Sequence, residues 1–278
     1  MFESKHASLL INAIASVAPI VSARIIYQVW TATKRTQRRP PEQACLQNAK
    51  KNTLTIENEK IAVYFWGDGP RVLLLHGWNG RATQYFAFIE SLQAHGYGVL
   101  AFDAPGHGDS SGKQTNLFQF VKVLEMLDAE YGEFEAVIAH SFGTTVAVNA
   151  LVKGLRSKAL VGISSPADYN LLLNSFTTHF GLNDKAEQAF FKLLKQKNNI
   201  NCFDEISIYY LAKEMNLPCL VVHDENDRQV PVTEAYKIIK TWPNAELYTA
   251  KGNGHSRILY NQDVIGKCIS FLENLKLC

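Results

Sequence analysis

Residues 137–152 read VIAHSFGTTVAVNALV, and the rest of the chain is organised around this stretch. A β-forming run at residues 136–139 meets His-Ser-Phe-Gly, and no helix breaker follows until Gly154, so the pattern predicts a strand that turns abruptly into a helix at Ser141. A serine at such an apex carries its hydroxyl beside a helix N-terminus, where amide N–H groups stabilise developing negative charge. Ser141 is therefore a candidate nucleophile. Serine is also a common helix N-cap, and this stretch alone leaves both interpretations open.

The composition is that of one large α/β domain. The chain has 278 residues, of which 47% are apolar and 19% charged, so it can bury a substantial core. The formal net charge is +2, which indicates neither a polyanionic partner nor an acidic substrate. Basic residues gather at residues 34–39 without interleaved aromatic residues, so no nucleic-acid partner is expected.

The cysteines indicate neither a metal site nor a disulfide framework. Five are scattered along the chain without CxxC spacing: Cys45, Cys202, Cys219, Cys268 and Cys278. An odd, dispersed set of this kind is typical of reduced thiols. We therefore expect a cytoplasmic protein that holds no metal and no cofactor.

The N-terminal residues 7–23 carry no formal charge, but they are too few and too diluted by polar residues to favour a membrane span. Their apolar residues recur at helical spacing: Leu10, Ile14, Val17, Val21 and Ile25. This pattern predicts an amphipathic helix, which lies either on a membrane or on its own domain. The basic residues 34–39 would suit an anionic lipid surface, although a solvated linker leading into Pro40 explains them too and is preferred. Peripheral membrane contact through residues 7–39 stays open.

From residue 53 onward, strand-like and helix-like patterns alternate. The runs 53–57 and 61–66, separated by Glu-Asn-Glu, predict a hairpin. Further strands are predicted at residues 71–75, 99–102, 136–139, 159–163, 218–223 and 245–249, and helices at 82–94, 116–131, 142–152, 233–241 and 259–275. This alternation predicts a mostly parallel sheet with helices on both faces, which binds ligands at the carboxyl ends of its strands.

The alternation breaks at residues 165–216, which predict a helical cap. Aromatic residues are too frequent there for a plain surface loop: Phe176, Phe180, Phe190, Phe191, Tyr209 and Tyr210. Most of them are expected to form the small core of the cap. One or two should face the site as an apolar pocket, and Phe176 and Phe180 are the candidates.

A nucleophilic Ser141 needs a general base, an acid that orients the base, and donors for an oxyanion. His255 ends the sequence GNGH after the last predicted strand, in a glycine-rich loop that could bring its imidazole to the serine. Two aspartates, Asp224 and Asp227, follow the strand at residues 218–223. Asp227 lies farther into the loop and is our choice for the orienting acid, with Asp224 as the alternative.

Together these motifs resemble the α/β-hydrolase fold superfamily. The matching stretches are HGW at 76–78, DAPGHG at 103–108, AHSFG at 139–143, Asp227 with the Val-Pro at 230–231, and GNGH at 252–255. The order serine, acid, histidine also fits, whereas Ala139 stands where the family usually has glycine. The resemblance implies a hydrolase domain at residues 52–278 with the cap at 165–216 inserted, and leaves an N-terminal helix and linker at 1–51.

The resemblance also implies an oxyanion hole formed by the backbone N–H groups of Trp78 and Phe142. A serine nucleophile implies an acyl-enzyme, so we expect hydrolysis of a small-molecule carboxylic ester or thioester. Acyl transfer to an alcohol shares that intermediate, and a non-catalytic binding protein with the hydrolase fold is the alternative from another class. His140, beside the nucleophile, either touches substrate or packs.

Overall fold

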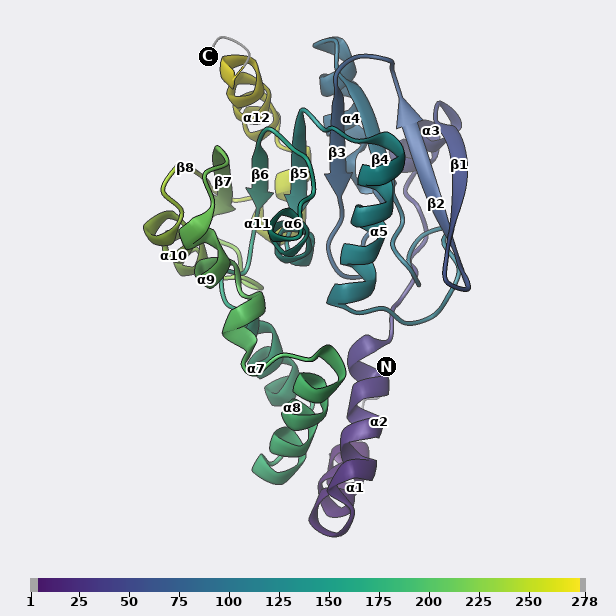
Figure 1. The fold of residues 1–278 in the computed structure, drawn as a ribbon, viewed down its shortest axis with the longest axis vertical. Helices are drawn as coiled ribbons and strands as arrows, with labels where there is room; N and C mark the ends of the chain where they lie inside the picture. Colours follow the sequence, from purple (N-terminus) through teal and green to yellow (C-terminus); the bar gives the residue numbers. More distant parts are fainter. Residues whose placement is uncertain (1–4, 276–278) are drawn as a thin grey trace.

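The computed structural model describes residues 5–275, so Cys278 lies outside the described part of the chain. Its centre is an eight-stranded sheet with the strand order β1-β2-β4-β3-β5-β6-β7-β8 (Figure 1). The strands are β1 Lys50–Ile56, β2 Glu59–Trp66, β3 Arg71–Leu75, β4 Gly98–Phe102, β5 Ala136–His140, β6 Leu160–Ile163, β7 Cys219–Asp224 and β8 Ala245–Ala250. β2 pairs antiparallel with β1 and β4, and all other neighbours are parallel. The predicted hairpin and the mostly parallel sheet are confirmed.

Helices cover both faces of this sheet. The helices are α1 Lys5–Val17, α2 Pro19–Thr31, α3 Pro40–Gln47, α4 Phe86–Ala94, α5 Leu117–Tyr131, α6 Phe142–Val152, α7 Tyr169–His179, α8 Asp184–Asn198, α9 Ile208–Leu211, α10 Thr233–Thr241, α11 Gly254–Arg257 and α12 Gln262–Leu275. Because side chains alternate along a strand, Leu73 and Leu75 share a core with α5, α6 and α10, whereas Val72 and Leu74 share one with α4 and α12.

Two predicted helices differ from the structure. The single N-terminal amphipathic helix is in fact two, α1 and α2, because Pro19 has no N–H to donate and the chain bends at Ala18 (φ −142°, ψ 66°). The last helix was predicted from residue 259, but a 3₁₀ turn occupies Ile258–Tyr260 and α12 follows it. The side chain of Asn261 accepts a hydrogen bond from the Val264 N–H (3.0 Å) and so begins the helix later.

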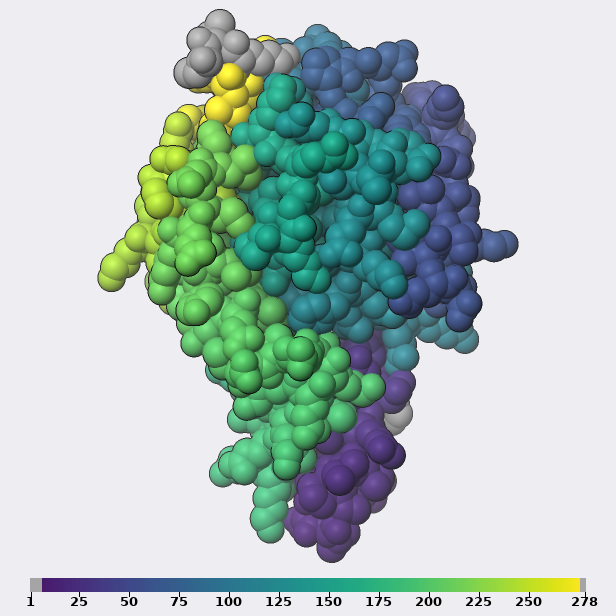
Figure 2. Space-filling model, viewed as in Figure 1, coloured from purple at the N-terminus to yellow at the C-terminus, as the bar shows by residue number. Residues whose placement is uncertain are grey.

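The N-terminal helices pack against the predicted cap segment, which holds α7 and α8 between β6 and β7. In Figure 2 they appear, in purple, beside the green cap as one lobe that projects from the sheet domain. The Asn12 side chain fastens α1 by donating to Gly181 O (2.9 Å) and accepting from Asn183 N (3.0 Å). Trp30 of α2 stacks edge-on against Phe176 and other cap aromatics. The sequence left two surfaces open for the N-terminal helix, a membrane and its own domain. In the structure, α1 and α2 pack against their own domain.

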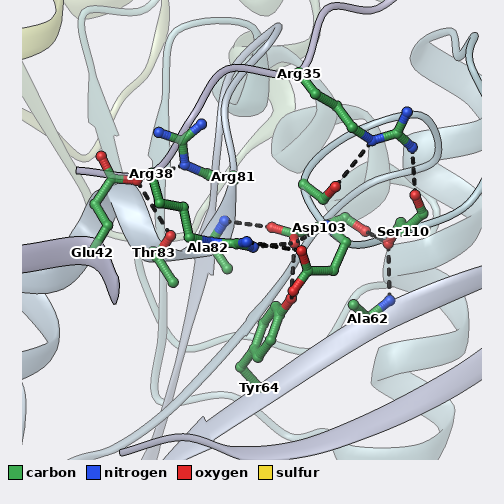
Figure 3. Close-up of polar contacts among 12 residues, drawn as sticks. Arg35, Arg38, Glu42, Ala62, Tyr64, Arg81, Ala82, Thr83, Asp103 and Ser110 are labelled. Carbon is green, nitrogen blue, oxygen red and sulfur yellow. Dashed lines mark hydrogen bonds and ion pairs between the residues drawn. The ribbon is translucent and has the colours of Figure 1, made fainter. Parts of the chain in front are cut away.

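Residues 32–39, here called the strap, carry the basic cluster and run over the sheet domain (Figure 3). The Arg35 guanidinium donates to three carbonyl oxygens of residues 108–112, and Arg38 pairs with Asp109 (2.8 Å) and lies 3.6 Å from Asp103. These two arginines therefore bind the protein itself. Most of residues 34–39, Arg35 included, are exposed as a solvated linker would be, but Arg38 is largely buried because the carboxylates of Asp103 and Asp109 supply acceptors.

The strap ends at a buried ion pair. Glu42 at the start of α3 accepts from Arg81 Nε (2.5 Å) and from Arg39 (2.9 Å). Arg81 also donates to the carbonyl and hydroxyl oxygens of Thr36, so both charges are surrounded by hydrogen-bond partners. In the described chain, residues 5–275, no helix combines the length and apolar character needed to cross a bilayer.

Candidate active site

Ser141 lies at the turn between β5 and α6, as the sequence predicts. Its backbone has φ +54° and ψ −125°, a conformation that costs a non-glycine residue roughly 1–3 kcal/mol. The surrounding structure holds it there: its N–H donates to Ile163 O (2.8 Å), and its carbonyl accepts from Thr144 N (2.9 Å). Its side chain does not cap α6, so the helix-cap interpretation is wrong.

The turn is crowded on the side of Gly143, and less so at Ala139. A Cβ on Gly143 would lie 2.6 Å from Leu75 O and 2.7 Å from His76 O, so that position requires glycine. Ala139 is fully buried, and its register partner in β6 is Gly162, which has no side chain. The turn therefore holds alanine at a position where the family usually has glycine.

Ser141, His255 and Asp227 form a continuous line of hydrogen bonds. The Ser141 Oγ lies 3.0 Å from His255 Nε2, and His255 Nδ1 lies 2.7 Å from Asp227 Oδ2. The other carboxylate oxygen of Asp227 accepts from the N–H groups of Gln229 (2.8 Å) and Val230 (3.0 Å). Burial alone would raise the pKa of Asp227, but the hydrogen bonds from His255 and these amides outweigh it and lower the pKa. The carboxylate is thus charged and aimed at the imidazole.

Asp224 has a different environment from Asp227. It accepts hydrogen bonds from Asn226 N (2.9 Å) and from both the backbone and side chain of Asn253 (2.8 and 3.1 Å). Burial opposes its ionisation, but these donors lower its pKa overall. Asp224 therefore anchors the loop that carries His255 and does not contact the imidazole itself.

His140 lies beside His255 and holds its loop. Its Nε2 is 2.8 Å from His255 O, and since a carbonyl only accepts, Nε2 carries the proton. The two rings lie 4.8 Å apart. Burial, and next the charge of His255, lower the pKa of His140 to about 3, so the ring stays neutral. His140 packs here and also lines the cavity in front of Ser141; its contact with substrate stays a prediction.

Two buried histidines shape the loops around Trp78. His76 Nε2 accepts from Ala104 N (3.1 Å), and His107 Nε2 accepts from Asn79 N (2.9 Å). Burial lowers the pKa of His76 to about 4 and that of His107 to about 3, so both remain neutral acceptors. Within the described chain, no hydrogen-bond acceptor is found for the backbone N–H of Trp78 or Phe142. Trp78 lies in the loop after β3, and Phe142 lies at the N-terminus of α6. Both residues line the cavity with Ser141.

A cavity of about 780 Å³ opens in front of Ser141. Its floor contains Trp78, His140, Ser141, Phe142 and His255, and its far wall comes from α2 and α7. Phe176 and Phe180, the predicted pocket residues, lie in that wall. Val29 and Trp30 of α2 also line the cavity, and the sequence analysis did not predict this. Their helical spacing after Ile26 could have indicated it, because Ile26, Val29 and Trp30 share one face of α2.

No converging set of three His, Cys, Asp or Glu side chains able to hold a metal ion occurs within residues 5–275. The polar groups around Ser141 are its own hydroxyl, the imidazoles of His140 and His255, and the carboxylate of Asp227 behind His255. Such a set suits nucleophilic attack on an electrophilic carbon and stabilisation of an oxyanion.

The chain is similar to known alpha/beta hydrolases. The alpha/beta hydrolase family model matches residues 72–204. Human protein ABHD12B is 29% identical over 194 residues, which are 63% of this chain and 51% of that protein. The pimeloyl-[acyl-carrier protein] methyl ester esterase of Xanthomonas axonopodis pv. citri is 22% identical over 243 residues, covering 73% of this chain and 94% of that enzyme. This chain thus spans about half the length of the human relative.

Solved structures show the same fold. An esterase of Pyrococcus furiosus superimposes with a TM-score of 0.64 at 20% identity, covering 88% of this chain and 97% of that one. The sheet order, the match of the family model to residues 72–204 and these likenesses agree on the fold: the chain has the α/β-hydrolase fold.

Proposed function

We propose that this chain is a serine hydrolase that cleaves a carboxylic ester or thioester through an acyl-enzyme on Ser141. The observation that carries the proposal is the unbroken hydrogen-bonded line from Ser141 through His255 to Asp227 at the floor of a large cavity. The esterase names of several relatives support the same reaction class. Residues 165–216 then serve as a cap over the site.

In the first half-reaction, Ser141 Oγ attacks the substrate carbonyl while His255 Nε2 accepts its proton. Asp227 stabilises the imidazolium that forms, and the N–H groups of Trp78 and Phe142 hold the oxyanion. The tetrahedral intermediate collapses when the bond to the alcohol or thiol breaks. His255 gives its proton to that leaving group, and the acyl group remains on Ser141.

In the second half-reaction, His255 takes a proton from water, whose oxygen attacks the acyl carbon. The bond to Ser141 Oγ breaks and the serine recovers its proton from His255. His140 is a positioning residue in this scheme, because it holds the backbone of His255 rather than touching the reacting atoms. The strained turn at Ser141 keeps Oγ exposed to both attacks.

The direct test replaces the nucleophile. Ser141→Ala should lower kcat/KM for a short p-nitrophenyl ester at least about 10⁴-fold, and a fluorophosphonate probe should label wild-type protein on Ser141. Ser157→Ala, a serine at the opposite end of the sheet, is the matched control and should keep full activity. Full activity in Ser141→Ala would overturn the proposal. Unlabelled, inactive wild-type protein would favour the non-catalytic binding protein.

Acyl transfer to an alcohol uses the same acyl-enzyme, so a partition experiment separates it from hydrolysis. We expect water to remain the dominant acceptor when a primary alcohol is added at millimolar concentration. Diversion of most of the acyl group to the alcohol at that concentration would reassign the chain as an acyltransferase.

We also propose that the α1–α2 hairpin rests on a membrane surface. Its tip exposes Val17 (85%) and Ile20 (66%), and α1 exposes Leu9 and Leu10, in a stretch free of formal charge. The full chain should co-sediment with phosphatidylcholine vesicles, and Val17→Glu should release it. Val152→Glu, at a site 55% exposed on α6, is the control. Equal binding by both variants would contradict the proposal.

A further inference from the structure

A second, apolar cavity lies between the N-terminal helices and the cap. It measures about 160 Å³ and is bounded by residues of α1, α2 and α7. Three side chains, Val29, Phe176 and Phe180, line both this cavity and the larger one in front of Ser141. The two spaces therefore adjoin at these three residues.

The chemistry of this second cavity is that of a hydrocarbon site. Leu10, Ile11 and Ile14 come from α1, and Ile25 and Ile26 from α2; the hydroxyl of Ser8 is the single polar side-chain group among its lining residues. An apolar cavity of similar size, roughly 150 Å³, can stay dry and bind a six-carbon hydrocarbon. A chain segment of that order would bury apolar surface here without leaving any buried polar group unpaired.

Polar contacts set the distance between the walls. Asn12 bonds Gly181 and Asn183 at the turn between α7 and α8, and Ser22 Oγ of α2 donates to Ile11 O of α1 (3.1 Å). These bonds hold α1 to both α2 and the cap at a fixed spacing. The cavity therefore depends on the hydrogen bonds that hold α1 in place. The α1–α2 hairpin forms part of its wall and also covers it.

We propose that this cavity is a distal acyl subsite, which binds the end of a long linear acyl chain whose carbonyl is attacked by Ser141. The inference rests on the proposed function and deepens it by naming the substrate class as long-chain acyl esters or thioesters. Short chains end in the larger cavity. Longer chains pass Val29, Phe176 and Phe180 and gain further burial between α1 and α2.

The test is an acyl-chain series of p-nitrophenyl esters from four to sixteen carbons with the full-length protein. Each methylene buried in the subsite should raise kcat/KM about fourfold until the cavity is filled. Ile14→Trp fills the cavity from α1 and should lower the ratio of long-chain to butyrate kcat/KM at least about tenfold. Ile14→Ala enlarges it and should move the optimum to a longer chain. Ala13→Trp, on an exposed position of the same helix that lines neither cavity, is the matched control and should leave the series unchanged.

Two measurements separate failure of this inference from failure of the proposed function. A chain-length series that is the same in wild type, Ile14→Trp and Ile14→Ala would overturn the subsite while leaving ester hydrolysis intact. Binding of a fluorescent long-chain fatty acid needs no turnover. If it is weakened at least about tenfold by Ile14→Trp in protein that hydrolyses no ester, the subsite stands and the proposed function fails.

Discussion

Two buried polar clusters lie at the same edge of the sheet, and each is centred on an aspartate. In the candidate active site, Asp227 faces His255 and Ser141. In the strap cluster, defined here as Arg38, Glu42, Tyr64, Arg81 and Asp103 (Figure 3), Asp103 accepts from the Tyr64 hydroxyl (2.9 Å) and from backbone amides of Ala82 and Asp109 (both 2.8 Å). Both aspartates are hydrogen-bonded on each oxygen, yet their pKa values shift in opposite directions.

The two clusters differ in the groups that contact the aspartate and in what those groups contact in turn. Burial dominates at Asp103 and raises its pKa, even though the amides, Tyr64 and Arg38 lower it. At Asp227 the hydrogen bond from His255 is the strongest opposing contribution, and the pKa is lowered. His255 in turn contacts a hydroxyl at the floor of a cavity, whereas the partners of Asp103 all belong to packed loops. A buried carboxylate alone therefore does not distinguish the two clusters. The role proposed for Asp227 depends on its partner His255, which reaches the cavity.

The largest expected effect tests this distinction among three aspartates. Asp227→Asn should lower kcat/KM for a p-nitrophenyl ester about 10³- to 10⁴-fold, because His255 loses the carboxylate that fixes its tautomer and stabilises the imidazolium. Asp224→Asn, which disturbs only the loop, should cost about tenfold or less, and Asp103→Asn should act on stability instead. Steady-state kinetics on folded protein measures all three. A larger loss in Asp224→Asn would make Asp224 the orienting acid.

The next effect concerns the buried ion pair of the strap cluster. Glu42→Gln should lower the free energy of unfolding by about 3 kcal/mol, because Arg81 keeps a buried charge whose partner is gone. Glu125→Gln breaks a pair with Lys153 in which both side chains are about half exposed, and should cost roughly 0–1 kcal/mol. Urea unfolding followed by circular dichroism compares them. Equal losses would show that burial does not distinguish these pairs.

The same pair predicts a pH dependence of stability. Burial opposes ionisation of Glu42, but the hydrogen bonds from Arg81 and Arg39 outweigh it and lower the pKa in the folded protein. A carboxyl group with a lowered folded pKa contributes stability above its unfolded pKa of about 4.3 and loses that contribution as the pH falls through the folded value. Wild type should therefore lose stability more steeply than Glu42→Gln below about pH 5. Parallel curves would contradict this assignment.

Sequence patterns were sufficient for features that depend on neighbours in the chain. The helix after Ser141 begins at Phe142 and ends at Val152 as predicted, because no breaker interrupts it and the glycine at 143 is needed where the turn approaches β3. The positions of His255 and Asp227 followed from strand ends, since parallel strands bring their carboxyl ends to one edge of the sheet.

The walls of the cavity could not be predicted in the same way. Val29 and Trp30 lie in a segment expected to precede the hydrolase domain, and their contacts with Phe176 join residues far apart in sequence. The contacts of the strap could not be predicted for a related reason. Only the fold places the carbonyls of residues 108–112 against Arg35 and Asp103 beside Arg38. Long-range packing determines these features, and a single sequence does not specify it.

The smallest expected effect probes the strap cluster at Tyr64, whose hydroxyl donates to Asp103 (2.9 Å) and lies 3.0 Å from a carboxylate oxygen of Asp109. Tyr64→Phe keeps the buried ring and removes this contact, so the free energy of unfolding should fall by about 1–2 kcal/mol. Tyr210→Phe, at a half-exposed position on the cap, should change it by less than about 0.5 kcal/mol.

Activity is the second readout for Tyr64→Phe, and it decides whether the two clusters act separately. Tyr64 is absent from the lining of the cavity, so kcat/KM of the folded variant should stay within about twofold of wild type. A loss approaching that of Asp227→Asn would mean that the loop at residues 103–109 transmits strain to Asn79 and the Trp78 amide through His107. The strap cluster would then affect catalysis. Asp103 and Asp227 would differ in their positions and not in whether they support activity.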